Sequence, residues 1–224
     1  MGKIITLSGP SGIGKTTLFN LIEEKLESKK LKLIPRFTNR PKRSGEMEGF
    51  EYYFISQNTL LVKVQNNDFI HFEKWGDYYS AIEKKSLDKI IESDYDGIIL
   101  ASTFGTSRLQ ATYLDNIIPI YMWSGNYKSL KNNNECLSPI GEEIIELKWR
   151  IRKKLVDDGF SEYETASLPY DEFLEKRMID NYLDIAAAYG KLNSGDNFFI
   201  LENAHNRENE MVERFFGYID KSRE

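Results

Sequence analysis

The chain contains very little cysteine and histidine. Its 224 residues include one cysteine, Cys136, and two histidines. A single cysteine cannot form an internal disulfide, which is typical of proteins that work in the reducing cytosol. No group of cysteines and histidines has the spacing of a zinc site. The composition therefore excludes a disulfide-stabilised scaffold and a zinc-stapled domain.

Long hydrophobic runs and a strong net charge are also missing. No apolar run approaches the ~18 residues of a membrane span, and the N-terminal residues have a strand pattern, not that of a signal peptide. The net charge of −5 argues against broad nucleic-acid binding. With 41% hydrophobic residues, the chain can bury a core of its own. We expect a cytoplasmic single-domain protein that binds neither membranes nor nucleic acid.

The segment GPSGIGKTT, residues 9–17, fits the phosphate-binding pattern G-x-x-x-x-G-K-[ST]. In such a P-loop the glycines let backbone N–H groups surround phosphates, the lysine reaches the β- and γ-phosphates, and the hydroxyl ligates Mg²⁺. The segment lies between an apolar run and a helical stripe, which is the required context. The predicted ATP-binding residues here are Gly9, Ser11, Gly12, Gly14, Lys15, Thr16 and Thr17. Thr16 is also the predicted Mg²⁺ ligand.

Five short apolar runs have the pattern of buried parallel strands. They cover residues 3–8, 31–34, 97–101, 117–122 and 198–201. Helical patterns alternate with them, at Leu18–Leu26, Ile82–Ile91, Phe173–Tyr189 and Met211–Ile219. This alternation predicts an α/β fold with a five-stranded parallel sheet and ligands at its carboxyl edge.

Two segments do not fit the alternation. Residues 35–81 are rich in aromatics and in short alternating runs, as in a small antiparallel sheet, and residues 124–170 are polar and basic, as in a mobile insertion. A phosphotransferase needs a core, an acceptor-binding lobe and a lid that excludes water. We therefore predict one domain with three parts. These are a core of residues 1–34, 82–123 and 190–224, a lobe of residues 35–81, and a lid with its following helix at 124–189.

A basic turn and nearby tyrosines suggest a second phosphate site. Arg40 and Arg43 are three residues apart, and Tyr52 follows in a short strand. Guanidinium groups match phosphate oxygens, and tyrosine hydroxyls add neutral donors. A phosphomonoester suits this set, and a solvated basic turn beside core tyrosines is an equal alternative on composition alone.

Residues 38–54 resemble the acceptor loop of the guanylate kinase family, T-x-R-x-x-R-x-G-E-x-x-G-x-x-Y-x-F. The matching residues are Thr38, Arg40, Arg43, Gly45, Glu46, Gly49, Tyr52 and Phe54. Residues 66–81, 172–192 and 198–203 resemble later segments of the family in the same order. The resemblance implies a P-loop kinase core with a small mixed lobe that binds a nucleoside monophosphate (NMP), a lid insertion, and ATP with Mg²⁺ as cosubstrate and cofactor.

The resemblance also implies roles for single residues. The acceptor phosphate would be held by Arg40, Arg43, Tyr52 and Tyr79. Asn203 would contact ATP. The catalytic cations would be Lys15, Arg177 on the post-lid helix, and a lid arginine that is either Arg150 or Arg152. Transfer in this family is driven by positioning, Mg²⁺ and cationic clamps.

The resemblance is weakest where the family reads guanine. The family uses four residues for this purpose, and this chain differs at all four. Arg36 replaces a serine and His71 replaces a glutamate. Ala81 replaces a serine or threonine, and Ser102 replaces an aspartate. Leu100 stands where the family has a further acid. Glu73 shares a face with His71 if residues 69–73 form a strand, so it can replace the missing glutamate. Arg36 can serve only the acceptors of a base, such as O6 and N7 of guanine.

GMP or dGMP is therefore the default acceptor, a different or modified base is nearly as well supported, and we expect a weaker preference for GMP than the family has. Two further interpretations stay open. One is a kinase of a non-nucleotide phosphate such as a sugar phosphate. The other is an inactive domain that binds protein partners, which the complete P-loop disfavours. The oligomeric state cannot be predicted.

Overall fold

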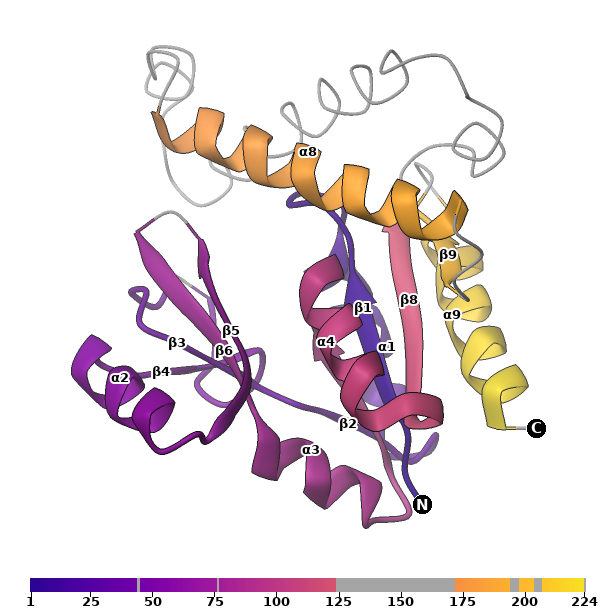
Figure 1. The fold of residues 1–224 in the computed structure, drawn as a ribbon. Helices are drawn as coiled ribbons and strands as arrows, with labels where there is room; N and C mark the ends of the chain where they lie inside the picture. The colour runs from indigo at the N-terminus through magenta and orange to yellow at the C-terminus, as the bar shows by residue number, and fades with distance from the viewer. Residues whose placement is uncertain (44, 76, 124–171, 194–197, 204–206, 224) are drawn as a thin grey trace.

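A five-stranded parallel sheet forms the centre of the fold (Figure 1). The computed structural model describes residues 1–223 except 44, 76, 124–171, 194–197 and 204–206. Across the sheet the strands are β2 (Leu31–Leu33), β7 (Asp96–Leu100), β1 (Ile4–Ser8), β8 (Ile117–Trp123) and β9 (Phe199–Glu202). All neighbours run parallel. The predicted five-stranded parallel sheet is confirmed.

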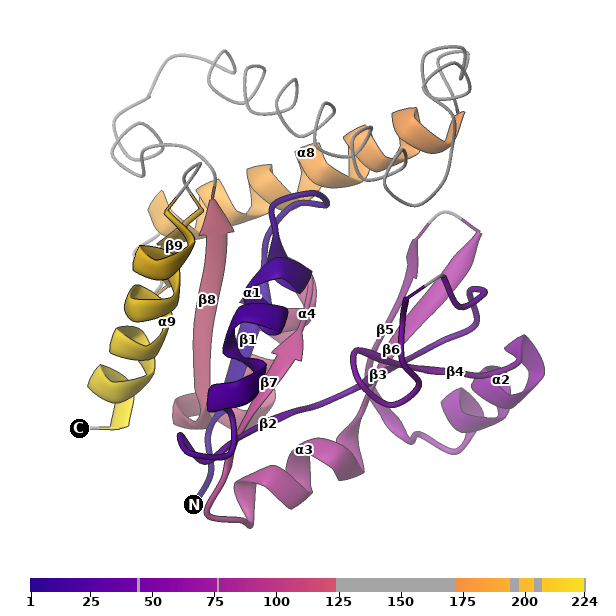
Figure 2. The ribbon, with the colours of Figure 1, turned by 180° about the vertical axis from the view of Figure 1, so that it is seen from behind.

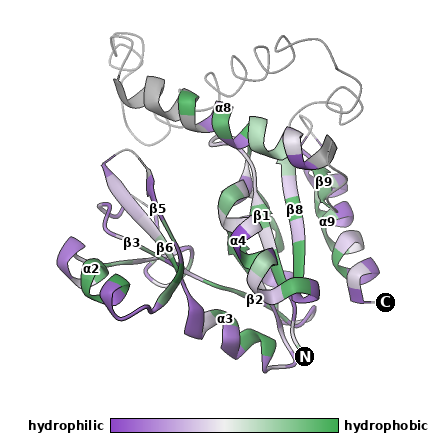
Figure 3. Cartoon of the chain, viewed as in Figure 1, coloured by the Kyte–Doolittle hydropathy of each residue, from purple (hydrophilic) through white to green (hydrophobic). Residues whose placement is uncertain are grey.

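Helices cover both faces of this sheet. Helices α1 (Lys15–Ile22) and α9 (Glu208–Arg223) lie on one face, and α3 (Lys84–Ile91) and α4 (Thr103–Tyr113) lie on the other (Figures 1 and 2). Two clusters of buried residues correspond to the two faces, one with Phe19 and Phe215 and one with Leu87 and Leu109. Hydrophobic residues are concentrated along β8 between these layers (Figure 3). Each such side chain stabilises the fold by about 1.5–3 kcal/mol when fully buried.

A second, four-stranded sheet stands beside the first (Figure 1). Its order is β4 (Tyr52–Phe54), β3 (Arg36–Thr38), β6 (Tyr78–Glu83) and β5 (Phe69–Trp75). Strands β3 and β4 are parallel, whereas β3–β6 and β5–β6 are antiparallel. The expectation of an antiparallel sheet is wrong for β3–β4, because the long acceptor loop carries the chain back to the end from which β3 starts.

Several helix boundaries differ from those predicted. Helix α1 ends at Ile22, and a short 3₁₀ turn, Glu23–Lys25, follows it. Helix α3 begins only at Lys84, because Ile82 pairs with His71 in the second sheet.

Two helices in the described chain were not predicted. Helix α2 (Gln57–Gln65) begins after Ser56, whose hydroxyl accepts the N–H of Thr59 at 3.1 Å. Helix α4 buries mainly small and polar residues, which leaves no apolar stripe. Its buried residues are Thr103, Gly105, Thr106 and Leu109.

Helix α8 (Glu172–Asn193) crosses above the carboxyl ends of β1 and β8 (Figures 1 and 2). Its buried residues Ile185 and Ala188 join the same hydrophobic cluster as α1 and α9. The helix therefore lies at the edge of the sheet where parallel α/β folds bind ligands. None of the helices in the described residues combines the length and apolarity that a membrane span requires.

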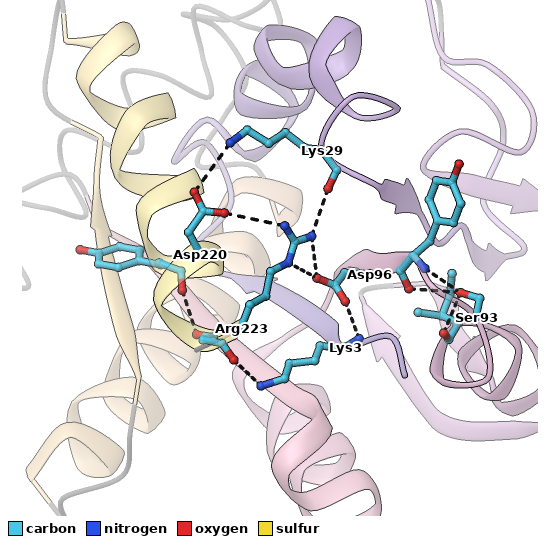
Figure 4. A network of polar contacts seen from close by, with 10 residues as sticks. Lys3, Lys29, Ser93, Asp96, Asp220 and Arg223 are labelled. Carbon is cyan, nitrogen blue, oxygen red and sulfur yellow. Dashed lines mark hydrogen bonds and ion pairs between the residues drawn. The ribbon is translucent and has the colours of Figure 1, made fainter.

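The far end of the sheet is held by a polar network around Asp96 (Figure 4). The Asp96 carboxylate is largely buried and accepts the backbone N–H of Lys3 at 2.6 Å and Nε–H of Arg223 at 2.8 Å. Arg223 also donates to the carbonyl of Lys29 at 3.0 Å. This network fastens the C-terminal helix α9 to the amino ends of β1 and β7.

We expect Arg223→Ala to lower the free energy of unfolding by about 1–3 kcal/mol, because it leaves the buried carboxylate without its cation. For a chain of this size that corresponds to a fall of several degrees in Tm, measured by calorimetry. Arg207→Ala is the matched control, since the Arg207–Glu210 pair at 3.7 Å is exposed and contributes less than about 1 kcal/mol. Equal losses in both variants would contradict a structural role for the network.

Candidate active site

The P-loop joins the end of β1 to the start of α1, as the sequence predicts. Gly14 precedes α1 with φ +100°, and a Cβ at this position would lie 2.4 Å from Nδ2 of Asn203. Only glycine fits this conformation and this close approach. The first N–H groups of α1 have no partner within the helix, so the helix start suits an anion.

Two predicted ATP-site residues contact the P-loop itself. Nζ of Lys15 donates to the carbonyls of Gly9 at 2.6 Å and Pro10 at 2.9 Å. Nδ2 of Asn203 donates to the carbonyl of Ile13 at 2.6 Å, and the backbone of Asn203 is bonded to β8. Lys15 is thus folded back onto the loop that would bind a phosphate, and Asn203, directly after β9, supports that loop.

The residues around Thr16 fit a bound Mg²⁺. The Thr16 hydroxyl donates to Oε1 of Glu51 at 2.9 Å, so two oxygen ligands of the kind that Mg²⁺ prefers lie together. Leu100, at the end of β7, contributes no carboxylate. Among the described residues no three His, Cys, Asp or Glu side chains form a metal-binding group. An ion here would take its remaining ligands from phosphate and water, as Mg²⁺ does in kinases.

Arg40, predicted to bind the acceptor phosphate, is held in place by Glu46. Nη1 of Arg40 donates to Glu46 at 2.7 Å, and the guanidinium lies 4.8 Å from the centre of the Tyr52 ring. Partial burial is the largest single influence and disfavours both charges, but the Arg40–Glu46 hydrogen bonds and the attraction of nearby opposite charges together outweigh it, so the pKa of Glu46 is lowered and the pKa of Arg40 is raised. Arg43 is exposed on the same loop.

Four of the predicted base-reading residues form one cluster around Glu73. Oε2 of Glu73 accepts the Ser102 hydroxyl at 2.7 Å and lies 3.0 Å from Nε2 of His71. Oε1 lies 3.5 Å from Nη1 of Arg36, and Nη2 of Arg36 donates to the Tyr52 hydroxyl at 2.6 Å. The cluster therefore brings together a carboxylate, a guanidinium and hydroxyls, and it extends to Tyr52, which is predicted to bind the acceptor phosphate.

The structure does not bring Tyr79 and Ala81 to this cluster. In β6, Ala81 lies opposite Phe72, and the Tyr79 ring stacks on Phe72 at 4.9 Å. Ser80 lies opposite Glu73, and alternate residues of a strand point to opposite faces. The resemblance placed Tyr79 and Ala81 in the acceptor site, and the β5–β6 register puts them on the other face of the sheet.

Tyr78 and Ser80 share the Glu73 face instead. Ser80 is 6% exposed, and its hydroxyl has no hydrogen-bond partner among the residues that the structure describes. A buried hydroxyl without a partner is costly unless a ligand or water satisfies it. Ser80 is therefore a candidate base contact that the sequence alignment missed by one position.

The remaining predicted residues are the lid arginines. Arg150 and Arg152 lie outside the described residues, and the side chain of Arg177 on α8 is not among those described. Two other polar residues of α8, Asn181 and Asp184, were missed by sequence reasoning, although both are buried and contact the site. Their signal in the sequence is a pair of polar residues three apart on a helix face that also carries Ile185 and Ala188.

The two halves of the site meet at neighbouring strand ends. Leu7 of β1 lies opposite Leu100 of β7, so the P-loop and Ser102 emerge side by side. The Glu73 cluster and Arg40, which belong to the second sheet and its loop, form the other side of the site. This arrangement can hold a nucleoside triphosphate next to a phosphate ester that carries a planar polar group.

A family model described as guanylate kinase matches residues 1–185 of this chain. The guanylate kinase of Mycoplasma mobile is 31% identical over 157 residues, which are 68% of this chain and 77% of that protein. That of Nitrobacter winogradskyi is 31% identical over 144 residues, 64% of this chain and 65% of that protein. The crystal structure of guanylate kinase from Anaplasma phagocytophilum has a TM-score of 0.61 at 14% identity, covering 98% of this chain and 85% of that one, which is a likeness of fold.

Proposed function

Because this chain belongs to the guanylate kinase family, we propose that it is an ATP-dependent kinase that transfers the γ-phosphate of Mg·ATP to GMP or dGMP. The observation that carries the choice of base is the position of Glu73, whose carboxylate lies between Ser102 and Arg36. The complete P-loop on the neighbouring strand end supports ATP as the donor.

The Glu73 cluster matches the polar edge of guanine. Guanine presents N1–H and N2–H as donors, which a carboxylate accepts, and O6 and N7 as acceptors, which an arginine serves. Adenine offers an acceptor at N1, which a carboxylate cannot bond. The sequence alone favoured a weaker preference for GMP because His71 and Ala81 replace hydrogen-bonding residues. With Glu73 and Ser80 on the site face, we expect a strong preference instead.

Catalysis in this proposal depends on position and charge. Arg40, Arg43 and Tyr52 hold the acceptor phosphate, whose anionic oxygen attacks without a general base. Lys15 and the P-loop N–H groups hold the transferring and leaving phosphates. Thr16 would hold Mg²⁺, which supplies charge neutralisation when bound. Arg177 and one of the two lid arginines, Arg150 and Arg152, complete the clamp, and the reaction takes place in the cytoplasm.

A panel of acceptors tests the proposed function. GMP, dGMP, AMP, CMP, UMP and dTMP are compared with Mg·ATP in steady state, and we expect kcat/KM for GMP to exceed that for AMP, CMP and UMP by at least about 10³. Similar rates on all of them would show that the base is not read. Turnover of none, with ATP still bound in a direct titration, would point to a modified or non-nucleotide acceptor.

A further inference from the structure

Helix α8 contacts both halves of the site through two polar side chains that lie one turn apart. Asn181 is 3% exposed and Asp184 is 5% exposed. Residues three apart on a helix are neighbours on one face. Asn181 contacts the P-loop and Asp184 contacts the start of α4, so one face of α8 reaches two separate loops.

The side chain of Asn181 binds both backbone groups of Ser11, a residue of the P-loop. The N–H of Ser11 donates to Oδ1 of Asn181 at 2.7 Å, and Nδ2 of Asn181 donates to the carbonyl of Ser11 at 3.3 Å. A strand neighbour would satisfy the same two groups in the same way. Ser11 is half-buried, so water replaces these two bonds only in part when they are lost, and the contact favours one conformation of the P-loop.

Asp184 holds the turn that presents Ser102. Oδ1 of Asp184 accepts the N–H of Thr103, the first residue of α4, at 2.9 Å. The neighbouring Ser102 hydroxyl accepts the N–H of Gly105 at 2.9 Å and donates to Glu73 at 2.7 Å. Burial raises the pKa of the Asp184 carboxyl, and the hydrogen bonds from Thr103 and the charge of Lys15 offset part of this rise.

We propose that Asn181 and Asp184 are positioning residues, one for each substrate. Asn181 sets the conformation of the P-loop that receives ATP, and Asp184 sets the turn that presents Ser102 and Glu73 to the acceptor base. Because both belong to one face of one helix, they fix the separation of the two half-sites. In-line transfer requires such fixed geometry. The acceptor half of this inference rests on the proposed function.

The Asn181 half is tested by direct titration of ATP, without any acceptor. We expect Asn181→Ala to raise the Kd of ATP by about 10-fold or more, since the Ser11 backbone loses its two bonds to Asn181, and to leave the Kd of GMP within about threefold. Leu183→Ala, on the same helix and 51% exposed, is the matched control and should change neither value. An unchanged Kd of ATP in Asn181→Ala would overturn this half.

The Asp184 half is tested by the same two titrations, with the larger change expected in the Kd of GMP. We expect Asp184→Ala to raise the Kd of GMP by about 10-fold and to leave that of ATP within about threefold. Asp184→Asn keeps an oxygen that accepts the Thr103 N–H, so it should bind GMP nearly as well as the wild type. Equal losses for ATP and GMP in both alanine variants, alongside a lower Tm, would show that the two residues only pack the helix.

These outcomes separate the inference from the proposed function. If the wild-type protein does not bind GMP, the proposed function fails and the Asp184 half fails with it. The ATP titration of Asn181→Ala still decides the other half, because that measurement needs no acceptor.

Discussion

We expect the Lys15→Ala variant to lose phosphoryl transfer by at least about 10³-fold in kcat while it stays folded. The lysine ammonium is the fixed cation nearest the phosphates in a P-loop, and removing one preorganised donor of this kind costs about 10²–10³ in rate or more. In the structure Nζ of Lys15 donates to two loop carbonyls, those of Gly9 and Pro10. Losing two such bonds lowers stability by about 1–3 kcal/mol, which leaves the hydrophobic core intact.

The measurement is single-turnover transfer from Mg·ATP to GMP, with Tm recorded for each protein. Lys89→Ala is the control, because Lys89 is exposed on α3, far along the chain from the P-loop. It should keep the wild-type rate. Residual turnover of Lys15→Ala within about tenfold of wild type would contradict the assigned role of Lys15 in stabilising the transferring charge.

Glu73→Gln should give the second large effect, a fall of about 10²–10⁴ in kcat/KM for GMP. The carboxamide presents an N–H₂ group where guanine presents N1–H and N2–H, so one accepted hydrogen bond is replaced by two facing donors. The substitution preserves the size of the side chain and one oxygen that can still accept the Ser102 hydroxyl. The KM for ATP should stay within about threefold, since Glu73 belongs to the acceptor side.

Glu213→Gln, on the exposed face of α9, is the matched control and should behave as wild type. Discrimination between GMP and AMP should shrink in Glu73→Gln because the loss falls on GMP. If kcat/KM for GMP changes by less than about fivefold while the protein remains folded, the base is read by other residues. His71, which lies 3.0 Å from Glu73, would then be the next candidate.

The core of the fold could be predicted because its signals are local. The buried parallel strands are short continuous apolar runs, and the helices of the core carry apolar stripes at helical spacing. Helix α4 escaped prediction because its buried side chains are mostly small or polar, as at Thr103 and Gly105, so its packing leaves no hydrophobic period. The parallel pairing of β3 and β4 escaped because the direction of a strand depends on the path of the loop before it.

The chemistry of the site could be predicted only in part. Lys15, Thr16 and Arg40 could be proposed from the sequence because a P-loop and an acceptor loop are continuous segments whose function comes from the local backbone path and a fixed spacing. Asn181 and Asp184 were not found, because their importance comes from loops far away in the sequence that helix α8 happens to cross.

The sequence by itself determined the class of this protein: a P-loop, an acceptor loop and an α/β alternation in the order of the guanylate kinase family. Only the tertiary structure decided which residues share the face of the second sheet that carries Glu73, where we propose that the acceptor base binds. Side chains of a strand alternate with a period of two, so a shift of one residue in the register of β5 and β6 exchanges one face for the other. That register puts Ser80 on the same face as Glu73 and turns Ala81 to the opposite face, and the sequence alone could not choose between Ser80 and Ala81.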